Sequence, residues 1–519
     1  MPNGAQNLIE GLVAADVDVC FANPGTSEMH FVAALDDVPR MRAVLCLFEG
    51  VATGAADGYG RMAGKPACTL LHLGPGLANG LANLHNARRA RTPLVNIVGD
   101  HALHHKRLDA PLESDISALA RTVSHWTRRT YYAGDLAADV AEAVAAAVGP
   151  PGAIATLLLP ADVSWSEAGK ATPAPVLPRS GVVSTTAVAE AARALRHGAK
   201  APAALLLGGS ATHGPGIRAA ARIAAATGCR LLCETFPARL ERGAGLPPVE
   251  RLAYRGEDAL GQLSGVRHLV LAGAAEPVTF FAYPGQQARL VPDGCEVRTL
   301  AAGTEDVTTA LEALAAGFDA VSPVPQAPLR PALPTGALTA ETAAAVIGAL
   351  LLEDAIVVDE SNTSGLWLPG ATAGAPPHDW LTLTGGAMGQ GLPAAVGAAL
   401  AAPGRPVLAL EADGSAMYTL QALWTMAREE LDITVVLFDN RSYAILNLEL
   451  TSVGAAPGGA RAGELLDLSR PDLDFVGLAR GLGVPAEQAT TAEEFRSLLG
   501  RALGEPGPYL IDCAVPPLF

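Results

Sequence analysis

The sequence predicts an α/β protein made of three doubly wound, parallel-sheet domains. Apolar runs alternate with amphipathic segments along all 519 residues, which is typical of strands and helices that alternate in parallel sheets. Two stretches rich in proline, 167–181 and 322–336, interrupt this alternation and have the composition of extended linkers. We therefore expect domains at 1–165, 182–321 and 337–519.

Each predicted domain contains short apolar runs that we interpret as buried strands. In the first domain the runs are DVCFANP, MRAVLCLFE, PACTLLHLG and PLVNIVGD, and TGAADGYGRMAG between them has a helical pattern. The middle domain has APAALLLGG, CRLLCE and VRHLVLAG. In the third domain, RPVLALEADGS and ITVVLFDN lie on either side of SAMYTLQALWTMAREE, which we predict to be one helix.

Composition argues against several classes of function. A net charge of −16 disfavours a nucleic-acid partner, which needs a basic face. The seven cysteines, an odd number with no CxxC pair, predict buried thiols in a reducing, cytoplasmic compartment. The N-terminal MPNGAQNLIEGL lacks the features of a signal peptide. The uncharged stretch 381–404 is dominated by small residues, so we expect a buried loop and helix and no membrane span.

Polar side chains follow two successive strands of the third domain. Asp413 and Gly414 end the first apolar run, and Asn440 ends the next. Ligands bind beyond the carboxyl ends of strands in such sheets, and successive strands are usually neighbours. A carboxylate, an amide oxygen and a loop carbonyl would suit Mg²⁺ that also binds phosphate oxygens. The alternative is that Asp413 caps the following helix and Asn440 is a turn residue.

An acidic residue followed by Gly-Ser, with an Asn 27 positions later, resembles the cofactor motif of thiamine-diphosphate (ThDP) enzymes. The sequence departs from that motif at Ala412 and Asp439, which flank the metal-binding positions. The resemblance implies that Mg²⁺ is held by Asp413, Asn440 and the carbonyl of Ser442. It also implies diphosphate contacts for a set of neighbouring residues: Gly414, Ser415, Tyr443, Ala444, Asn362 and Thr363.

The segment TGGAMGQGLPAAVGAAL, 384–400, is also similar to the family. Family members place a bulky apolar residue before a Gly-rich turn, where it bends the cofactor, and Met388 matches that position. The Gly386 carbonyl would then accept a hydrogen bond from the aminopyrimidine. Taken alone, Met388 has the simpler interpretation of core filling.

In the segment AVLCLFEGVATGAADGYGR of the first domain, the acid at the end of the apolar run is Glu49. A lone acid at such a place is usually a helix cap. The spacing to Arg61, however, resembles the segment of the family's catalytic glutamate, which acts on the cofactor's pyrimidine. Many relatives have His before this Glu, where this sequence has Phe48.

Three segments, PGTSE, LFEG and LLHLGPG, together resemble those of benzoylformate decarboxylases. The resemblance implies that Thr26 faces substrate and that His72 relays protons. Helix capping by Thr26 or Ser27 and a structural His72 are the simpler alternatives. The comparable segment of the middle domain, EPVTFFAYPGQQ, has Phe280, Phe281 and Tyr283 where those enzymes have a second catalytic His.

The resemblance implies a ThDP- and Mg²⁺-dependent decarboxylase or carboligase that acts on a 2-oxo acid, similar to acetolactate synthases. The alternatives are a ThDP lyase for another donor, such as an acyl-CoA, and a non-catalytic ThDP-binding homologue. The family places its cofactor between the first domain of one subunit and the third domain of another, which implies a homodimer or a dimer of dimers.

Two further segments have open interpretations. The Gly-rich LLLGGSATHGPG, 205–216, is either part of an FAD site, as in some acetolactate synthases, or only a strand-to-helix turn. His101, His104 and His105 either reach the site from a loop or are solvated.

Overall fold

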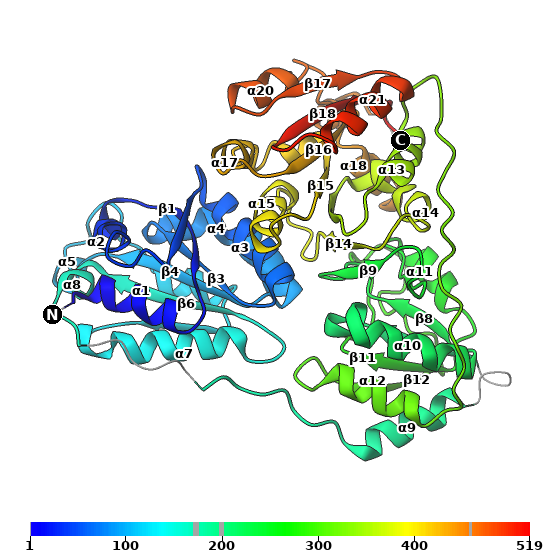
Figure 1. Ribbon diagram of the computed structural model, residues 1–519, viewed down its shortest axis with the longest axis horizontal. Coiled ribbons are helices and arrows are strands. Elements are labelled where there is room, and N and C mark those ends of the chain that lie inside the picture. The colour runs from blue at the N-terminus through cyan, green and yellow to red at the C-terminus, as the bar shows by residue number, and fades with distance from the viewer. Residues whose placement is uncertain (1, 170–175, 197–201, 456–458, 519) are drawn as a thin grey trace.

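The computed structural model describes residues 2–169, 176–196, 202–455 and 459–518, and contains three α/β domains, each built on its own sheet (Figure 1). The first sheet has six parallel strands. Across the sheet they are β2 (Arg42–Leu45), β1 (Val19–Asn23), β3 (Ala67–Leu71), β4 (Leu94–Asp100), β6 (Ile154–Pro160) and β5 (Trp126–Arg129). MRAVLCLFE was expected to be a buried strand, and this was wrong for part of it: β2 is at the sheet edge, so Arg42 and Ala43 are exposed.

Helices cover both faces of the first sheet, as the doubly wound prediction requires. Alternate residues of β1 separate the two faces, because Phe21 packs in one apolar cluster and Cys20 in the other. One face carries α3 (Glu49–Ala63), α4 (Leu73–Ala90) and α6 (Ile116–Arg121). The other carries α1 (Gly4–Ala14), α2 (Met29–Ala34), α7 (Leu136–Val148) and α8 (Ala161–Trp165).

The middle sheet has five parallel strands. Their order is β10 (Glu250–Arg251), β8 (Arg230–Cys233), β7 (Ala203–Leu207), β11 (His268–Ala272) and β12 (Glu296–Ala301). One face packs on α9 (Thr185–Leu195), α10 (Gly214–Thr227) and α12 (Val307–Ala316), and the other on α11 (Gly256–Leu263). The Gly-rich segment 205–216 forms the end of β7, the turn Gly209–Thr212 and the start of α10.

The third sheet has seven strands, and one of them comes from the middle domain. The order is β17 (Ala486–Ala489), β18 (Tyr509–Ala514), β16 (Ile433–Asp439), β15 (Val407–Ala412), β13 (Ile356–Glu360), β14 (His378–Thr382) and β9 (Leu240–Arg242). β9 pairs antiparallel with β14, whereas the other pairs are parallel. The middle domain thus supplies an edge strand that the sequence analysis did not foresee.

The helices of the third domain also lie on both faces of their sheet. One face carries α15 (Gly391–Ala401), α17 (Ala422–Arg428) and α20 (Phe475–Gly481), and the other carries α13 (Ala340–Leu350), α14 (Leu368–Ala371) and α21 (Ala492–Ala502). The segment predicted as one helix after β15 is interrupted. It forms α16 (Asp413–Ala416) and, after a turn, α17, because Thr419 in the turn bonds to the Gly389 carbonyl.

The first and third domains share one apolar core where α3 packs on α15. The two backbones approach closely, since a Cβ on Gly58 would lie 2.1 Å from the Ala394 carbonyl oxygen. One on Gly397 would lie 1.8 Å from that of Ala55. Small residues on both helices therefore fix the distance between the two domains that carry the predicted site residues.

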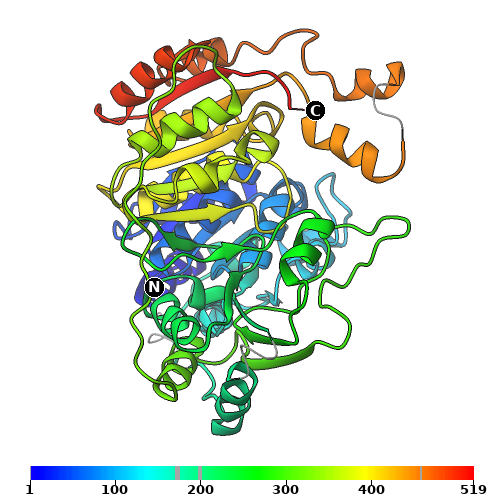
Figure 2. The same cartoon turned by 90° about the vertical axis from the view of Figure 1, so that its right-hand side faces the viewer.

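The linker predicted at 322–336 contains neither helix nor strand and runs along the surface between the middle and third domains (Figure 1). It is tied to the middle domain by two bonds between Gln326 and the segment Gly245–Leu246. The linker predicted at 167–181 lies partly outside the described residues. Figure 2 shows the remaining third-domain helices, α18 (Ala444–Ser452) and α19 (Ala460–Leu466), at one side of the molecule, above loops of the middle domain.

All seven cysteines are free thiols, and six of them are buried. Among the helices in the described part of the chain, none has both the length and the apolar composition needed to cross a bilayer.

Candidate functional site

Asp413 links the ends of two neighbouring strands, as the sequence predicts. Its Oδ1 accepts a hydrogen bond from the Gly414 amide at 2.7 Å, and its Oδ2 accepts from the amides of Asn440 and Arg441 at 3.1 and 2.6 Å. The simpler interpretation as a helix cap was wrong, because Ala412 is the capping residue of α16 and the Asp413 carboxylate reaches across to β16. Burial, with Asp439 adding a like charge, raises the pKa of Asp413 to about 7.

Asn440 and Ser442 lie opposite Asp413, just after the end of the neighbouring strand β16. The Asn440 side-chain oxygen accepts from the Ser442 amide at 3.0 Å, and its Nδ2 lies 3.5 Å from the hydroxyl of Ser364. A buried carboxylate, an amide oxygen and nearby carbonyls are hard oxygen donors that fit Mg²⁺. Within the described ranges there is no group of three or more His, Cys, Asp or Glu side chains that could hold a metal.

Two of the residues predicted to contact the diphosphate lie beside Met388. Asn362 donates to the Ser415 hydroxyl at 2.8 Å, and that hydroxyl lies 3.3 Å from the Met388 sulfur. Asn362 has a φ of +50°, a backbone conformation rare for a non-glycine residue, which points its side chain at Ser415. Met388 is half-buried and faces polar groups, so it is not ordinary core filling. We call Asp413, Asn440, Asn362, Ser415 and Met388 the third-domain cluster.

The Gly-rich loop at 384–391 is held from both sides. Buried Glu360 accepts hydrogen bonds from the amides of Gly389 and Gly391 at 2.7 and 2.5 Å. From the first domain, Asn83 and Asn86 donate to the carbonyls of Gly389 and Ala387 at 2.9 and 2.8 Å. The loop that carries Gly386 and Met388 is therefore held in place by residues of both domains.

Two acids beneath this loop, Glu360 and Glu411, were not predicted from the sequence. They lie side by side in the register of β13 and β15, and both are fully buried. Burial raises the pKa of Glu360 to about 7, and burial together with the charge of Glu360 raises the pKa of Glu411 well above its usual range. Glu411 is the charged residue within the otherwise apolar strand β15, and this was the signal that could have revealed it.

His72 lies in a hydrogen-bonded group at the start of α4. Its Nδ1 is 2.8 Å from a carboxylate oxygen of Glu28 and 3.3 Å from the hydroxyl of Ser27. Glu28 is buried and also accepts from the Gly25 amide at 2.8 Å. A Cβ on Gly25 would lie 2.2 Å from His72 Nδ1, so the ring needs a glycine there.

Thr26 is exposed, and the neighbouring hydroxyl of Ser27 is the one that contacts His72. The predicted role of Thr26 in facing substrate stays a prediction. Glu28 belongs to the PGTSE segment but was not singled out from the sequence. It does bond the Gly25 amide, but the same carboxylate also contacts His72, which only the fold could reveal.

Glu49 is the first residue of α3, with Phe48 as the capping residue, so the cap interpretation of Glu49 was wrong. Its side chain is buried, and its Oε2 accepts from Asn79 at 3.0 Å. Glu49 and His72 share Gly76 as a neighbour, since a Cβ there would lie 3.2 Å from Glu49 Oε1 and 3.3 Å from His72 Cβ. We call Glu28, Ser27, His72, Glu49 and Asn79 the first-domain cluster.

The other candidates from the sequence, three histidines and the Gly-rich segment 205–216, have no described hydrogen bond to either cluster. His101 and His105 pack ring against ring at 5.2 Å, and His104 is exposed near Asp162. At the Gly-rich segment of the middle domain, the Glu234 carboxylate fills the space beside Gly208, with 2.8 Å to a Cβ built there. That acid would oppose a phosphate at the turn, so the possible FAD site gains no support.

Comparison with known proteins identifies one family for both outer domains. Residues 2–119 match the family described as thiamine pyrophosphate enzyme, N-terminal TPP binding domain, and residues 363–513 match its C-terminal TPP binding domain.

Two relatives align along nearly the whole chain. A Mycobacterium tuberculosis protein named "Putative acetolactate synthase large subunit IlvX" is 63% identical over 99% of both chains. Benzoylformate decarboxylase from Pseudomonas aeruginosa is 31% identical over 95% of both. Among solved structures, the ThDP-dependent 4-hydroxybenzoylformate decarboxylase of Rhodococcus jostii RHA1 superposes with a TM-score of 0.85, at 25% identity and 99% coverage of both chains.

Proposed function

The chain belongs to the thiamine pyrophosphate enzyme family, and from this premise we propose that it is a ThDP- and Mg²⁺-dependent enzyme that decarboxylates a 2-oxo acid. The observation that carries the proposal is the arrangement of the Asp413 carboxylate beside Asn440. A carboxylate buried to 2% exposure, beside an amide oxygen at the ends of adjacent strands, needs a cation to be stable in its charged form.

In the proposed site, Asp413, Asn440 and the Ser442 carbonyl hold Mg²⁺. The diphosphate would lie against the backbone of Gly414 and Ala444 and the side chains of Ser415, Tyr443, Asn362 and Thr363. Gly414 suits this role, because a Cβ there would lie 2.4 Å from the Tyr443 ring. Met388 would support the bend of the cofactor, and the Gly386 carbonyl would accept from its aminopyrimidine. Bound ThDP supplies the electron sink that lets the 2-oxo acid lose CO₂.

The first-domain cluster supplies the proton chemistry in this proposal. Glu49 holds a proton at its carboxyl group beside the pyrimidine, and Asn79 keeps that carboxyl in place. His72 moves a proton to or from the reacting carbon, while Glu28 and Ser27 hold its Nδ1 side and leave the opposite ring nitrogen to act. Thr26, next in the chain, would face the substrate.

The proposal extends to assembly and location. Within one chain, the loop at 384–391 has its backbone bonded to Asn83 and Asn86, while the Met388 side chain faces Ser415. We propose that the first-domain cluster of a second copy completes the site on the Met388 side, in a homodimer or dimer of dimers. The seven free thiols support a cytoplasmic location.

Carboligation is the second candidate reaction. It is favoured by the name of the 63% identical relative, which refers to acetolactate synthase. In that reaction, a second carbonyl compound takes the place of the proton that would otherwise complete an aldehyde product. The paired His72 and Glu28 support protonation, and therefore the aldehyde-forming decarboxylase, as the first choice.

The test is CO₂ release by the holoprotein from pyruvate, benzoylformate, glyoxylate and branched 2-oxo acids, with and without an added aldehyde. We expect release from at least one of them, and a loss of about 10²–10⁴-fold in kcat for Glu49→Gln, because a positioned acid or base contributes that much. Glu10→Gln, an exposed change on α1, is the matched control.

Two results would contradict the proposal. Turnover of an acyl-CoA without any 2-oxo acid activity would favour a lyase of another type. Bound ThDP and Mg²⁺ without turnover of any donor would favour a non-catalytic homologue.

A further inference from the structure

One side of α4 runs from the first-domain cluster to the Gly-rich loop at 384–391 of the same chain. His72 is the capping residue of this helix, and Asn79, which belongs to the same cluster, lies on its second turn. Asn83 and Asn86 follow at spacings of four and three residues, so the three asparagines share one side of the helix. One helix thus carries residues of the first-domain cluster at its start and contacts to the loop farther along.

The side chain of Asn86 pairs with the backbone of Ala387 in both directions. Its Oδ1 accepts from the Ala387 amide at 3.1 Å, and its Nδ2 donates to the Ala387 carbonyl at 2.8 Å. Ala387 lies between Gly386 and Met388, the two residues proposed to contact the cofactor's pyrimidine and to support its bend. A Cβ on Gly385 would lie 2.5 Å from Asn86 Oδ1, so a glycine at this position allows the close approach.

Asn83 holds the next part of the loop and the start of α3 at the same time. Its Nδ2 donates to the Gly389 carbonyl at 2.9 Å and to the Gly50 carbonyl at 2.8 Å, and Gly50 follows Glu49 in the chain. Its Oδ1 accepts from Asn86 Nδ2 at 3.0 Å. Both hydrogens of each Nδ2 are therefore used, and each Oδ1 has a donor.

The two asparagines are almost completely buried, with exposed fractions of 2% for Asn83 and 0% for Asn86. A buried amide network in which every group is paired has little freedom, because a shift of the loop would leave polar groups without partners. The network therefore fixes the loop relative to α4 and, through Gly50, relative to the start of α3.

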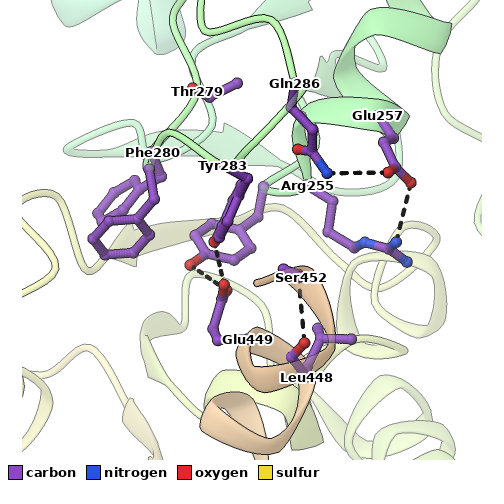
Figure 3. Close-up of a pocket in the computed structure, with 12 residues that line it drawn as sticks. Arg255, Glu257, Thr279, Phe280, Tyr283, Gln286, Leu448, Glu449 and Ser452 are labelled. Carbon is purple, nitrogen blue, oxygen red and sulfur yellow. Dashed lines mark hydrogen bonds and ion pairs between the residues drawn. The ribbon is translucent and has the colours of Figure 1, made fainter. Parts of the chain in front are cut away.

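The middle domain contacts the loop in a less constrained way. A Cβ on Gly386 would lie 2.7 Å from the Phe280 ring, but Phe280 is 43% exposed. In Figure 3, Phe280 lies beside a small pocket in which the Tyr283 hydroxyl donates to Glu449 of α18. That bond joins the middle domain to α18 and does not hold the loop directly. The Phe280 ring can turn without breaking a hydrogen bond, whereas the two asparagines cannot.

We propose that Asn83 and Asn86 are positioning residues for the cofactor that the third domain of their own chain binds. The inference rests on the proposed function, which places the first-domain cluster of each chain at the cofactor of the second copy. Each α4 then serves two sites, with His72 and Asn79 at the cofactor of the second copy and the two later asparagines at its own. The loop that they hold keeps its groups in place for the pyrimidine half of ThDP.

The competing interpretation is that the two asparagines only join the first and third domains. The two roles predict different results with two ligands. ThDP binds through its pyrimidine and its diphosphate, whereas inorganic pyrophosphate with Mg²⁺ matches only the diphosphate half, at Asp413. A positioning role affects ThDP alone, and a general loosening of the domains affects both ligands.

The test is calorimetric titration of the wild type and Asn86→Ala with ThDP and with inorganic pyrophosphate, each at the same Mg²⁺ concentration. We expect ThDP affinity to fall about tenfold in the variant, because a loop that is in place only about a tenth of the time lowers the apparent affinity by that factor. Pyrophosphate affinity should change by about twofold or less. Asn83→Ala should show the same selective loss, so a misfolded Asn86→Ala protein would not block the test.

Asn96→Ala is the matched control. Asn96 is also 0% exposed, but it lies on β4 and bonds Thr69 and Thr156 within the first domain. We expect this change to lower the melting temperature and to leave both affinities at their wild-type values.

Wild-type ThDP affinity in both loop variants would overturn the proposal. An equal loss of affinity for ThDP and pyrophosphate would overturn it too, because that is the result of a contact that only joins the domains. Failure of the wild type to bind ThDP would overturn the proposed function together with this inference.

A second experiment tests which cofactor each α4 serves. Chains with two different affinity tags are produced together, and mixed dimers are purified through both tags and assayed at a ThDP concentration near the wild-type Kd. A Glu49→Gln chain paired with an Asn86→Ala chain should place both changes in one site and leave the other intact, so we expect about half of the wild-type rate. A chain with both changes, paired with a wild-type chain, damages both sites and should give about a tenth.

The reverse order of these two rates would show that each site lies within one chain, and it would overturn the proposed assembly and the double role of α4. Equal rates of about one half in the two mixed dimers would show that Asn86 does not position the loop, and would overturn this inference while the proposed function stands.

Discussion

The first-domain and third-domain clusters are both acidic and buried, but their acids are satisfied in opposite ways. In the first-domain cluster, Glu28 is bonded to His72 and Ser27, and Glu49 to Asn79. In the third-domain cluster, the Asp413 carboxylate accepts hydrogen bonds from three backbone amides and lies near the like charge of Asp439. The first cluster is complete without a ligand. We propose that this difference divides proton transfer, in the first-domain cluster, from cation and cofactor binding, in the third-domain cluster.

The largest effect on the contrast between the two clusters is expected from removing the negative charge of Asp413. Asp413→Asn keeps the shape but removes the anionic oxygen donor, so we expect the affinity for ThDP in the presence of Mg²⁺ to fall by about 100-fold or more, with a matching loss of activity. Calorimetric titration of ThDP at fixed Mg²⁺ measures the effect.

Asp432→Asn is the matched control, because Asp432 precedes β16 at the opposite end of the strand that leads to Asn440. Equal ThDP affinities in wild type and Asp413→Asn would show that the metal is held elsewhere.

The second prediction concerns the pH dependence of stability without ligands. Asp413 has a pKa of about 7 when folded, against about 4 when unfolded, so between these values the native state binds more protons than the unfolded state. Stability from this group is therefore greatest below pH 4 and is lost as the pH rises toward 7. We expect the ligand-free wild type to lose about 2–4 kcal/mol relative to Asp413→Asn between pH 5 and pH 8.

Thermal unfolding at both pH values, with and without Mg²⁺ and ThDP, checks this. The ligands should restore the wild type at pH 8 and leave the variant unchanged. A pH-independent difference between the two proteins would contradict the raised pKa of Asp413.

The third prediction concerns Glu28 of the first-domain cluster. Glu28→Gln removes the carboxylate that orients His72, and we expect kcat to fall by about 10–100-fold while ThDP affinity stays near wild type, because only the alignment of the ring is lost. Stopped-time product assays and ThDP titration measure the two quantities separately. A parallel loss of ThDP affinity would mean that Glu28 is needed for the fold of the site rather than for the position of His72.

The smallest expected effect separates two adjacent hydroxyls. Ser27→Ala removes the hydroxyl 3.3 Å from His72 Nδ1 and should lower kcat by about 3–10-fold, the value of one hydrogen bond. Thr26→Ala removes an exposed hydroxyl and should act mainly on KM if Thr26 faces the substrate. Steady-state kinetics of both variants measure kcat and KM. A change mainly in KM for Ser27→Ala and mainly in kcat for Thr26→Ala would contradict this assignment.

The sequence predicted the architecture and the neighbouring positions of Asp413 and Asn440, because strand periodicity and the carboxyl-end rule are local or nearly local signals. It did not predict β9 in the third sheet or the break of the helix after β15. Those features depend on partners that are distant in the chain, such as β14 and Gly389. Glu28 was missed for a different reason: a carboxylate that caps a helix gives the same local pattern whether or not it also holds a histidine.

The edge strand β9 has a consequence for any attempt to shorten or recombine this chain. Removing the middle domain would take Leu240–Arg242 away and leave the backbone groups of β14 unpaired along the flank of the remaining six strands. Unpaired flanks of this kind recruit strands from other molecules, so the truncated protein would be prone to aggregate. A chimaera of the two outer domains would therefore have to retain this three-residue segment, or cap β14 with charged or proline residues, to stay dispersed.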